Sequence, residues 1–238
     1  MAIHVDYGEI ALRNQKKHLP DSNAISNRKL KDFVDSCFAE ALVQHSLAPC
    51  WVCVNCMSDG TPTFGWGRGP GKCLTCSERS VYQVATFNAW APVVGAAFSA
   101  AAYHLLRSIY RIPMHETPGH TTTHDFEVTG LVALEAKGSP STIKNPDGSN
   151  YQLKRPGLQR TDTEKKAFAN AKTFRQRNPD AYFGVITNAM PARLLNYRDA
   201  TVSGIFNLTR HEEIEVFVRD LGQTLDLEAL RKQEFGSK

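Results

Sequence analysis

The sequence predicts an α/β protein in which helices pack on a β-sheet and a small metal-binding module is inserted. Two observations carry this prediction. In the second half of the chain, segments with the apolar content of strands alternate with segments of helical periodicity, the pattern of a sheet covered by helices. Residues 47–80, by contrast, hold five of the six cysteines and too few aliphatic side chains to form their own core.

Length and composition place the chain among ordinary globular proteins. Its 238 residues suffice for one main domain with an insertion, and 42% apolar with 22% charged residues excludes disordered and fibrous classes. The first residues show no basic and apolar segments of a secretion signal. We therefore expect a cytoplasmic protein of a bacterial or archaeal cell, with reduced thiols.

The first predicted element is an N-terminal helical segment, residues 1–46, packed on the core. Within it, residues 26–46 place apolar side chains at helical spacing behind a Ser26 or Asn27 cap. Residues 89–106 are the most apolar stretch, but they contain Pro92 and are rich in Ala rather than Leu. This composition favours a buried helix over a membrane span, so we expect no membrane partner.

The remaining elements belong to a predicted catalytic core, residues 81–238. Two short strands joined by a Thr129-Gly130 turn are followed by a polar loop and by a helix that a capping box at 161–164 opens. A buried strand, a further helix, a strand and a final helix complete the chain. The expected ranges, in this order, are strands 125–128 and 131–137, helix 162–177, strand 181–187, helix 193–201, strand 204–208 and helix 212–221.

The cysteines between residues 47 and 80 have the spacing of a zinc site. Cys53-x2-Cys56 and Cys73-x2-Cys76 are separated by 16 residues, so that two tight turns can complete a tetrahedral sulfur shell. A structural Zn²⁺ would also supply the stability that the missing apolar core cannot. Cys50 extends the first pair to C-x2-C-x2-C, which leaves Cys50 as an alternative ligand and an iron–sulfur cluster as an alternative cofactor.

Residues 125–137 contain the parts of a phosphodiester-cleaving site. Glu135 and Lys137 lie two apart on one predicted strand and therefore share a face. An antiparallel turn brings Asp125 beside them, and two carboxylates suffice for Mg²⁺, which retains several waters. Lys137 can then orient the water or stabilise developing charge. Glu127 shares the face of Asp125 and competes for the first acidic position, although we favour Asp125.

These residues resemble those of a known family. The pattern Asp125-x9-Glu135-Ala136-Lys137, followed by a helix and the strand YFGVITN, is similar to the PD-(D/E)xK nuclease superfamily, and the stretch 181–221 resembles the closing elements of Mrr-like restriction nucleases. The resemblance covers roughly residues 85–222. It implies a mixed central sheet flanked by helices and Mg²⁺-dependent DNA cleavage, with Asp125 and Glu135 as metal ligands and Lys137 as the catalytic lysine. His124 stands where the motif often has proline.

The charge pattern is consistent with a nucleic-acid substrate. Residues 138–178 carry nine Lys or Arg against three Asp or Glu. The loop that follows the expected strand 131–137 contains four cations that we expect to contact the phosphates of double-stranded DNA: Lys144, Lys154, Arg155 and Arg160. The leading hypothesis is an Mg²⁺-dependent endonuclease of restriction type. A homodimer is compatible with this hypothesis, because duplex DNA has two strands. The alternatives are a non-catalytic zinc-ribbon module that binds nucleic acid, and an iron–sulfur nuclease of DNA repair or processing.

Overall fold

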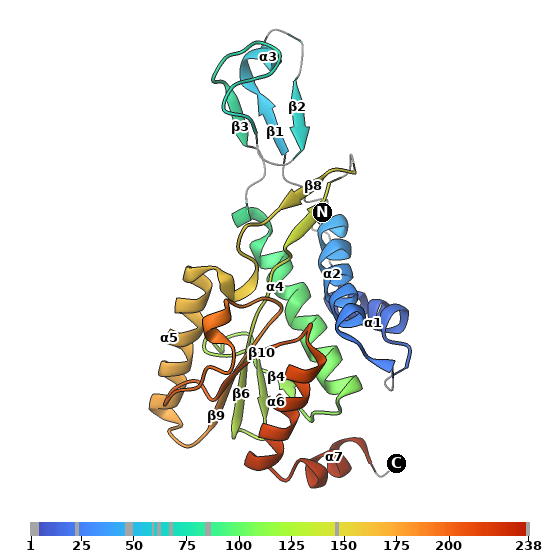
Figure 1. Ribbon diagram of the computed structural model, residues 1–238, viewed down its shortest axis with the longest axis vertical. Helices are drawn as coiled ribbons and strands as arrows, with labels where there is room; N and C mark the ends of the chain where they lie inside the picture. Colours follow the sequence, from blue (N-terminus) through green and yellow to red (C-terminus); the bar gives the residue numbers. More distant parts are fainter. Residues whose placement is uncertain are drawn as a thin grey trace.

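The fold consists of a mixed five-stranded sheet between helices and a small three-stranded module at one end of the molecule (Figure 1). The computed structural model describes residues 5–21, 24–45, 50–58, 60, 63–66, 69–83, 87–145 and 148–236. The predicted α/β class, with a mixed central sheet and a small cysteine-rich module, is thus confirmed. Among the residues described, no helix combines the length and apolar content that crossing a membrane requires.

The central sheet has the strand order β10-β9-β6-β5-β4. β4, β5 and β6 form an antiparallel meander, whereas β6, β9 and β10 run parallel to one another. Strand β6 lies in the middle and is buried along nearly its whole length, because both faces of the sheet are covered. The strands are β4 (His115–Glu116), β5 (Phe126–Val128), β6 (Val132–Lys137), β9 (Tyr182–Thr187) and β10 (Gly204–Asn207).

Helices cover the two faces of this sheet unequally. The larger core lies between the sheet and the helices α1, α2, α4 and α6, with Leu227 of α7 at its edge, and the smaller core lies between the sheet and α5. Residues of β6 alternate between them, since Leu134 belongs to the larger core and Ala133 to the smaller. The helices are α1 (Tyr7–His18), α2 (Asn27–Gln44), α4 (Phe87–His104), α5 (Thr161–Arg177), α6 (His211–Thr224) and α7 (Leu227–Phe235).

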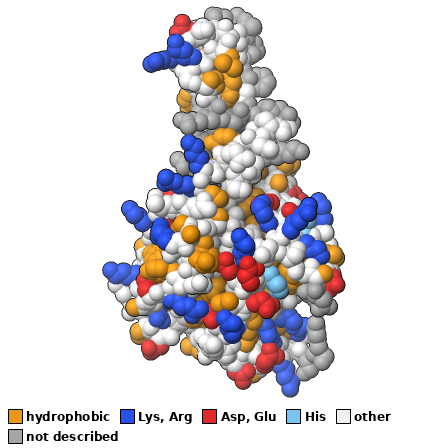
Figure 2. All heavy atoms as spheres, in the orientation of Figure 1, with side chains coloured by type: hydrophobic (Ala, Val, Ile, Leu, Met, Phe, Trp, Pro, Cys, Tyr) orange, Lys and Arg blue, Asp and Glu red, His pale blue; other side chains and the backbone are white. Residues whose placement is uncertain are grey.

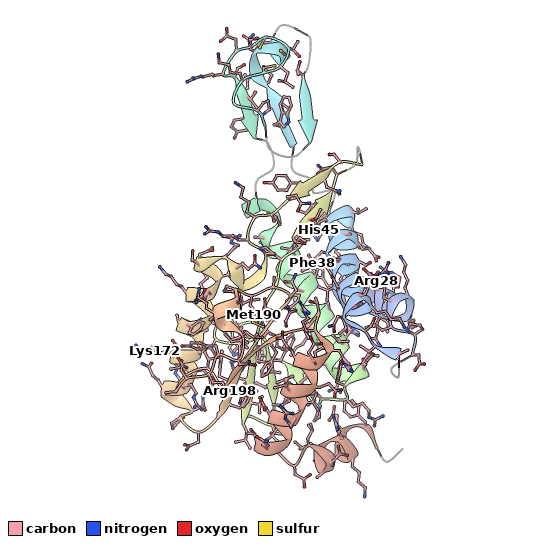
Figure 3. All side chains as sticks on the ribbon, viewed as in Figure 1. Arg28, Phe38, His45, Lys172, Met190 and Arg198 are labelled. Carbon is pink, nitrogen blue, oxygen red and sulfur yellow. The ribbon has the colours of Figure 1, made fainter. Side chains whose placement is uncertain are left out.

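Helix α4 is the apolar segment that the sequence predicts as a buried helix. It packs against α1, α2 and β6, and it continues into one π-helical turn, Leu105–Ile109. Phe38 of α2 points toward α4 (Figure 3), where its ring stacks on Phe98 with the centroids 6.1 Å apart. The N-terminal helices α1 and α2 are therefore integrated into the main core.

The cysteine-rich module is a three-stranded antiparallel sheet with one short helix. Its strand order is β2-β1-β3, and the third strand lies just beyond the expected boundary at residue 80. A separate hairpin, β7–β8, lies between this module and the body (Figure 1). The elements are β1 (Cys50–Cys53), α3 (Val54–Ser58), β2 (Phe64–Trp66), β3 (Val81–Gln83), β7 (Thr142–Lys144) and β8 (Asn150–Gln152).

Two local expectations are wrong. The segment 193–201 forms only one 3-10 turn, Ala192–Leu194, because Asn196 has a φ of 59° and Asp199 accepts the backbone N–H groups of Thr201 and Val202 at 2.7 Å each. Helix α5 begins at Thr161 without a side-chain cap. Its expected capping box is absent because the Glu164 carboxylate forms an ion pair with an arginine, Arg193, instead.

Candidate functional site

The hairpin register brings Asp125 beside Glu135. Phe126 of β5 pairs with Leu134 of β6, and just before it the Asp125 N–H donates to the Leu134 carbonyl at 2.9 Å. The Asp125 side chain also accepts the Ala136 N–H, so Asp125 lies beside the segment 134–136 that contains Glu135. The turn residues Thr129 and Gly130 have φ values of 54° and 71°, as a two-residue hairpin turn of this twist requires. The predicted turn therefore reverses the chain here, so that Asp125 and Glu135 lie at the same end of the hairpin.

Glu135 is a buried carboxylate with two donors on one oxygen. Its Oε1 accepts the Asn170 amide of α5 at 2.9 Å and is paired with the Lys137 ammonium. Its Oε2 has no hydrogen-bond partner among the residues described. Burial raises the pKa of Glu135 to about 7, and the nearby Asp125 adds to this rise, while Lys137 and Asn170 oppose it. Near neutral pH the carboxyl is thus poised between its two protonation states.

Asp125 and Glu127 occupy different environments. The Asp125 Oδ2 accepts the backbone N–H of Ala136 at 2.7 Å, which ties this half-buried side chain to the end of β6. Glu127 pairs in register with Ala133, and its carboxylate lies 2.9 Å from the Nε2 of His124. The structure therefore places Asp125, the residue favoured from sequence, beside Glu135 and directs Glu127 toward a buried histidine.

A cavity of about 460 Å³ opens at the C-terminal end of β6. One wall is the N-terminal half of α4, which contributes small residues such as Gly95 and Ser99. The charged lining comes from the opposite side: Asp125, Lys137, Arg160, Asp162 and Lys166. Glu135 is not part of this lining because it is buried between β6 and α5, behind Lys137.

After Lys137 the chain continues through Gly138 and Ser139, which pack tightly at the end of β6. A Cβ on Gly138 would lie 2.1 Å from the Phe98 ring, so only glycine permits this approach of β6 to α4. Ser139 then anchors the following loop, since its Oγ accepts the Gly157 N–H at 2.8 Å and its backbone bonds to the Asn188 side chain. These contacts fix the path of the chain that carries Arg160 to the cavity.

The four cations expected to contact DNA do not form one group. Arg160 lines the cavity and pairs with Asp162 at 2.7 Å, whereas Lys154 and Arg155 are exposed outside it. The side chain of Lys144 lies outside the described residues. On the face drawn in Figure 2, Lys and Arg side chains are scattered among Asp and Glu and form no continuous basic surface over the described residues in this view.

The predicted four-cysteine cluster is assembled. The Sγ atoms of Cys53, Cys56, Cys73 and Cys76 all lie within 4.8 Å of one another, with Cys53–Cys76 at 3.6 Å and Cys56–Cys73 at 3.7 Å. Zn–S bonds of about 2.3 Å in a tetrahedron place the sulfurs about 3.8 Å apart. The donor set therefore fits a single tetrahedral metal ion such as Zn²⁺.

Local hydrogen bonds favour the thiolate form of two of these cysteines, Cys53 and Cys73. The Cys53 sulfur accepts the Cys56 N–H at 3.4 Å and lies 3.0 Å from the Ser80 hydroxyl, and these contacts lower the pKa of the Cys53 thiol to about 6. An iron–sulfur cluster would hold its ligand sulfurs farther apart than one ion does. The side chain of Cys50, the alternative ligand, lies outside the described residues.

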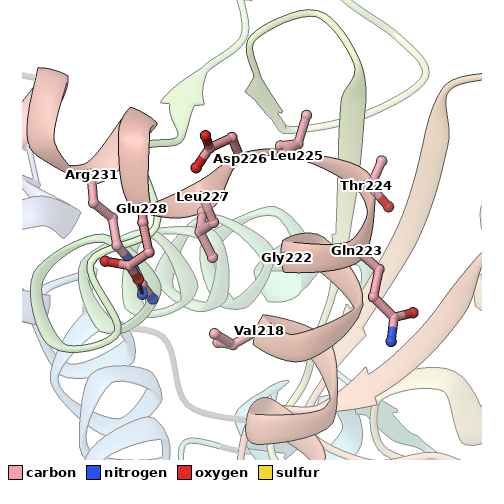
Figure 4. A pocket seen from close by; sticks show the side chains of 9 residues that line it. All are labelled: Val218, Gly222, Gln223, Thr224, Leu225, Asp226, Leu227, Glu228 and Arg231. Carbon is pink, nitrogen blue, oxygen red and sulfur yellow. Dashed lines mark hydrogen bonds and ion pairs between the residues drawn. The ribbon is translucent and has the colours of Figure 1, made fainter.

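A second hollow lies between α6 and α7 but does not gather reactive groups (Figure 4). It has a volume of about 630 Å³, and its charged side chains are engaged locally. Asp226 caps α7 by accepting the Ala229 N–H at 3.0 Å, and Glu228 pairs with Arg231 at 2.6 Å. These contacts stabilise the helix rather than create a binding site.

Sequence reasoning missed two residues of α5, Lys166 and Asn170. Lys166 lines the cavity, and Asn170 contacts Glu135 from one helical turn farther along. The sequence does contain a signal for Asn170, because this polar residue falls within the apolar stripe that Ala167, Ala171 and Phe174 form on the helix. A polar residue in such a stripe needs a partner across the interface, but the sequence does not name that partner.

Comparison with known proteins adds no family to this picture. No family model matches the chain, and no curated protein or solved structure is found to be similar to it. A function must therefore be argued from the side chains at the end of β6 and from the four-cysteine cluster.

Proposed function

We propose that this protein is an Mg²⁺-dependent DNA endonuclease of the PD-(D/E)xK, restriction-endonuclease-like type, with a zinc-stabilised module. One observation carries the proposal. Adjacent strands bring the carboxylates of Asp125 and Glu135 together with the Lys137 ammonium at the edge of a cavity that Arg160 and Lys166 also line. This is the set of charges that hydrolysis of a phosphodiester requires.

Asp125 and Glu135 are the residues that would hold the divalent ion. Asp125 Oδ1 and Glu135 Oε2 have no hydrogen-bond partner among the described residues, so each acid keeps one oxygen available as a ligand. Mg²⁺ is commonly held by one or two carboxylates while it retains several waters. A bound Mg²⁺ supplies Lewis-acid charge neutralisation and a water of lowered pKa.

The cations would act on the substrate itself. Lys137 is partly exposed toward the cavity, and its ammonium can move from Glu135 to a phosphate oxygen or to the attacking water. Arg160 and Lys166 face the same space from the start of α5, where they would bind the phosphates that flank the scissile bond. The three cations together would hold a polyanion against the end of β6.

Double-stranded DNA is the substrate that best fits the surroundings. Lys154 and Arg155 are exposed on the loop between the β7–β8 hairpin and α5, where a backbone leaving the cavity would contact them. The cysteine-rich module lies beyond this hairpin (Figure 1) and would clamp or read the duplex. A homodimer would present two such sites to the two strands.

The test is a cleavage assay on supercoiled plasmid DNA with Mg²⁺, with EDTA and with Ca²⁺ in place of Mg²⁺. Wild-type protein should cut only with Mg²⁺, and Asp125→Asn and Lys137→Ala should lower the rate at least about 100-fold. Lys172→Ala is the matched control, because Lys172 points outward from α5 (Figure 3). Full activity of the two site variants would remove this site from the mechanism.

A non-catalytic nucleic-acid-binding role is the second candidate. It is favoured by the module, whose two cysteine turns present Val54 at 52% and Leu74 at 83% exposure, next to the exposed Lys72 and Arg79. Apolar side chains flanked by cations can insert between bases while phosphates are neutralised. Salt-dependent DNA binding without cleavage in any divalent metal would favour this function.

A further inference from the structure

Asn170 is the residue of α5 whose side chain reaches the acidic pair. Its amide nitrogen donates to the Glu135 Oε1 at 2.9 Å, across the interface between the helix and β6. Ala167 and Ala171 on either side of it are fully buried against the sheet. The position of the amide is therefore fixed by packing of the helix rather than by an exposed loop.

The two oxygens of Glu135 are made unequal by this contact. Both protein donors, Asn170 and Lys137, bond to Oε1, and Oε2 has no donor among the residues described. The terminal torsion of a glutamate is broad, so a carboxylate without a fixed donor can exchange its two oxygens by rotation. Lys137 ends in a long flexible chain next to the cavity, and among the described residues only Asn170 holds Oε1 from a packed helix.

The chemistry of the amide also suits this task. A neutral donor orients a carboxylate without offsetting the negative charge that attracts a divalent cation. A lysine or arginine at position 170 would orient the group but compete with the cation for it. An aspartate there would repel Glu135 and lack the donor.

We propose that Asn170 is a positioning residue for the divalent-metal site: it holds Oε1 of Glu135 so that Oε2 is presented as a metal ligand. This inference rests on the proposed function, because it assigns Glu135 as a ligand. Removal of partners that orient metal ligands typically costs about 10- to 100-fold in metal affinity or activity. Asn170→Ala should accordingly weaken metal binding without abolishing DNA binding.

The first measurement is Mn²⁺ binding to the zinc-loaded full-length protein without DNA, followed by the loss of the Mn²⁺ electron paramagnetic resonance signal. Asn170→Ala should raise the Kd for Mn²⁺ about 10-fold or more. Asn170→Gln, which keeps an amide donor, should lie between this variant and wild type. Thr173→Ala is the matched control, since Thr173 is exposed on the same helix and bonds only to the Ala169 carbonyl among the described residues.

The second measurement is the Mg²⁺ dependence of plasmid cleavage. Asn170→Ala should shift the half-saturating Mg²⁺ concentration upward by a similar factor, with more of the rate recovered at high Mg²⁺ and with DNA affinity unchanged. A side chain that only docks the helix would lower the melting temperature and leave both metal dependences as in wild type. That result overturns the inference.

The outcomes separate this inference from the proposed function. If wild type binds Mn²⁺ and cuts DNA while Asn170→Ala and Asn170→Gln keep wild-type metal affinity, only the role of Asn170 is wrong. If wild type neither binds Mn²⁺ outside the cysteine cluster nor cuts DNA, the proposed function is wrong, and the role inferred for Asn170 is then wrong as well. Should Asn170→Ala fail to fold, the comparison of Asn170→Gln with Thr173→Ala decides the matter.

Discussion

Glu135→Gln should make the metal-free protein more stable while it removes activity. In the folded state the pKa of Glu135 is raised from 4.5 to about 7 by burial. A difference of about 2.5 pKa units corresponds to about 3 kcal/mol at about 1.4 kcal/mol per unit. This is the cost of holding the carboxylate ionised in its buried site, and a neutral glutamine avoids it.

The pH dependence of this gain has a definite sign. The folded pKa of Glu135 lies above the unfolded value. Its contribution to the free energy of unfolding is therefore fully present below pH 4.5 and is lost as the pH rises through about 7. Wild type and Glu135→Gln should therefore have similar stability near pH 4.5. Above pH 7 the variant should exceed wild type by up to about 3 kcal/mol. Glutamine can keep both contacts of Oε1, since its carbonyl oxygen accepts from Asn170 and Lys137 alike.

The assay is thermal and urea unfolding of both proteins between pH 4.5 and 8.5 in EDTA-treated buffer, with zinc retained in the module. At pH 8 the melting temperature should rise by roughly 6–12 °C, at about 2–4 °C per kcal/mol for a chain of this size. The exposed Glu116 provides the control, and Glu116→Gln should change little. Equal stability at pH 8, or a pH-independent difference, would refute the argument that burial of this charge is costly. Added Mg²⁺ should stabilise wild type but not Glu135→Gln.

Three further perturbations test other parts of the structure. Cys73→Ser should release zinc and unfold the cysteine-rich module, seen as loss of protection of its amides from hydrogen exchange, whereas unchanged protection would mean that the cysteines bind no metal. Lys166→Ala should weaken DNA binding and reduce its salt dependence relative to Lys172→Ala, because Lys166 lines the cavity and Lys172 does not; equal effects would argue against phosphates in the cavity. Gly138→Ala should cost about 1–3 kcal/mol in the free energy of unfolding, because its Cβ would lie 2.1 Å from the Phe98 ring, and a melting temperature equal to wild type would contradict the close approach.

Local patterns were sufficient for much of the fold. The spacing of apolar residues predicts α2, α4 and α5, and the turn residues Thr129 and Gly130 predict the hairpin that aligns Asp125 with Glu135. Helix α7 and the 3-10 turn at Ala192–Leu194 were not anticipated, because side-chain hydrogen bonds and packing against distant segments decide them. Local propensity carries no information on such partners.

Taken by itself, the sequence determined the chemistry available at two places: four thiols at metal-ligand spacing and an acidic pair with a lysine at the end of a strand. These depend on residue type and on separations of a few residues, which backbone geometry converts directly into proximity. Only the tertiary structure decided that Asn170 of α5 contacts Glu135 and that Lys166 of the same helix lines the adjacent cavity, although both follow Glu135 by about 30 residues. It also decided that Glu135 is buried and holds its proton more tightly, because burial depends on how α5 packs against β6 rather than on the identity of neighbours in the chain.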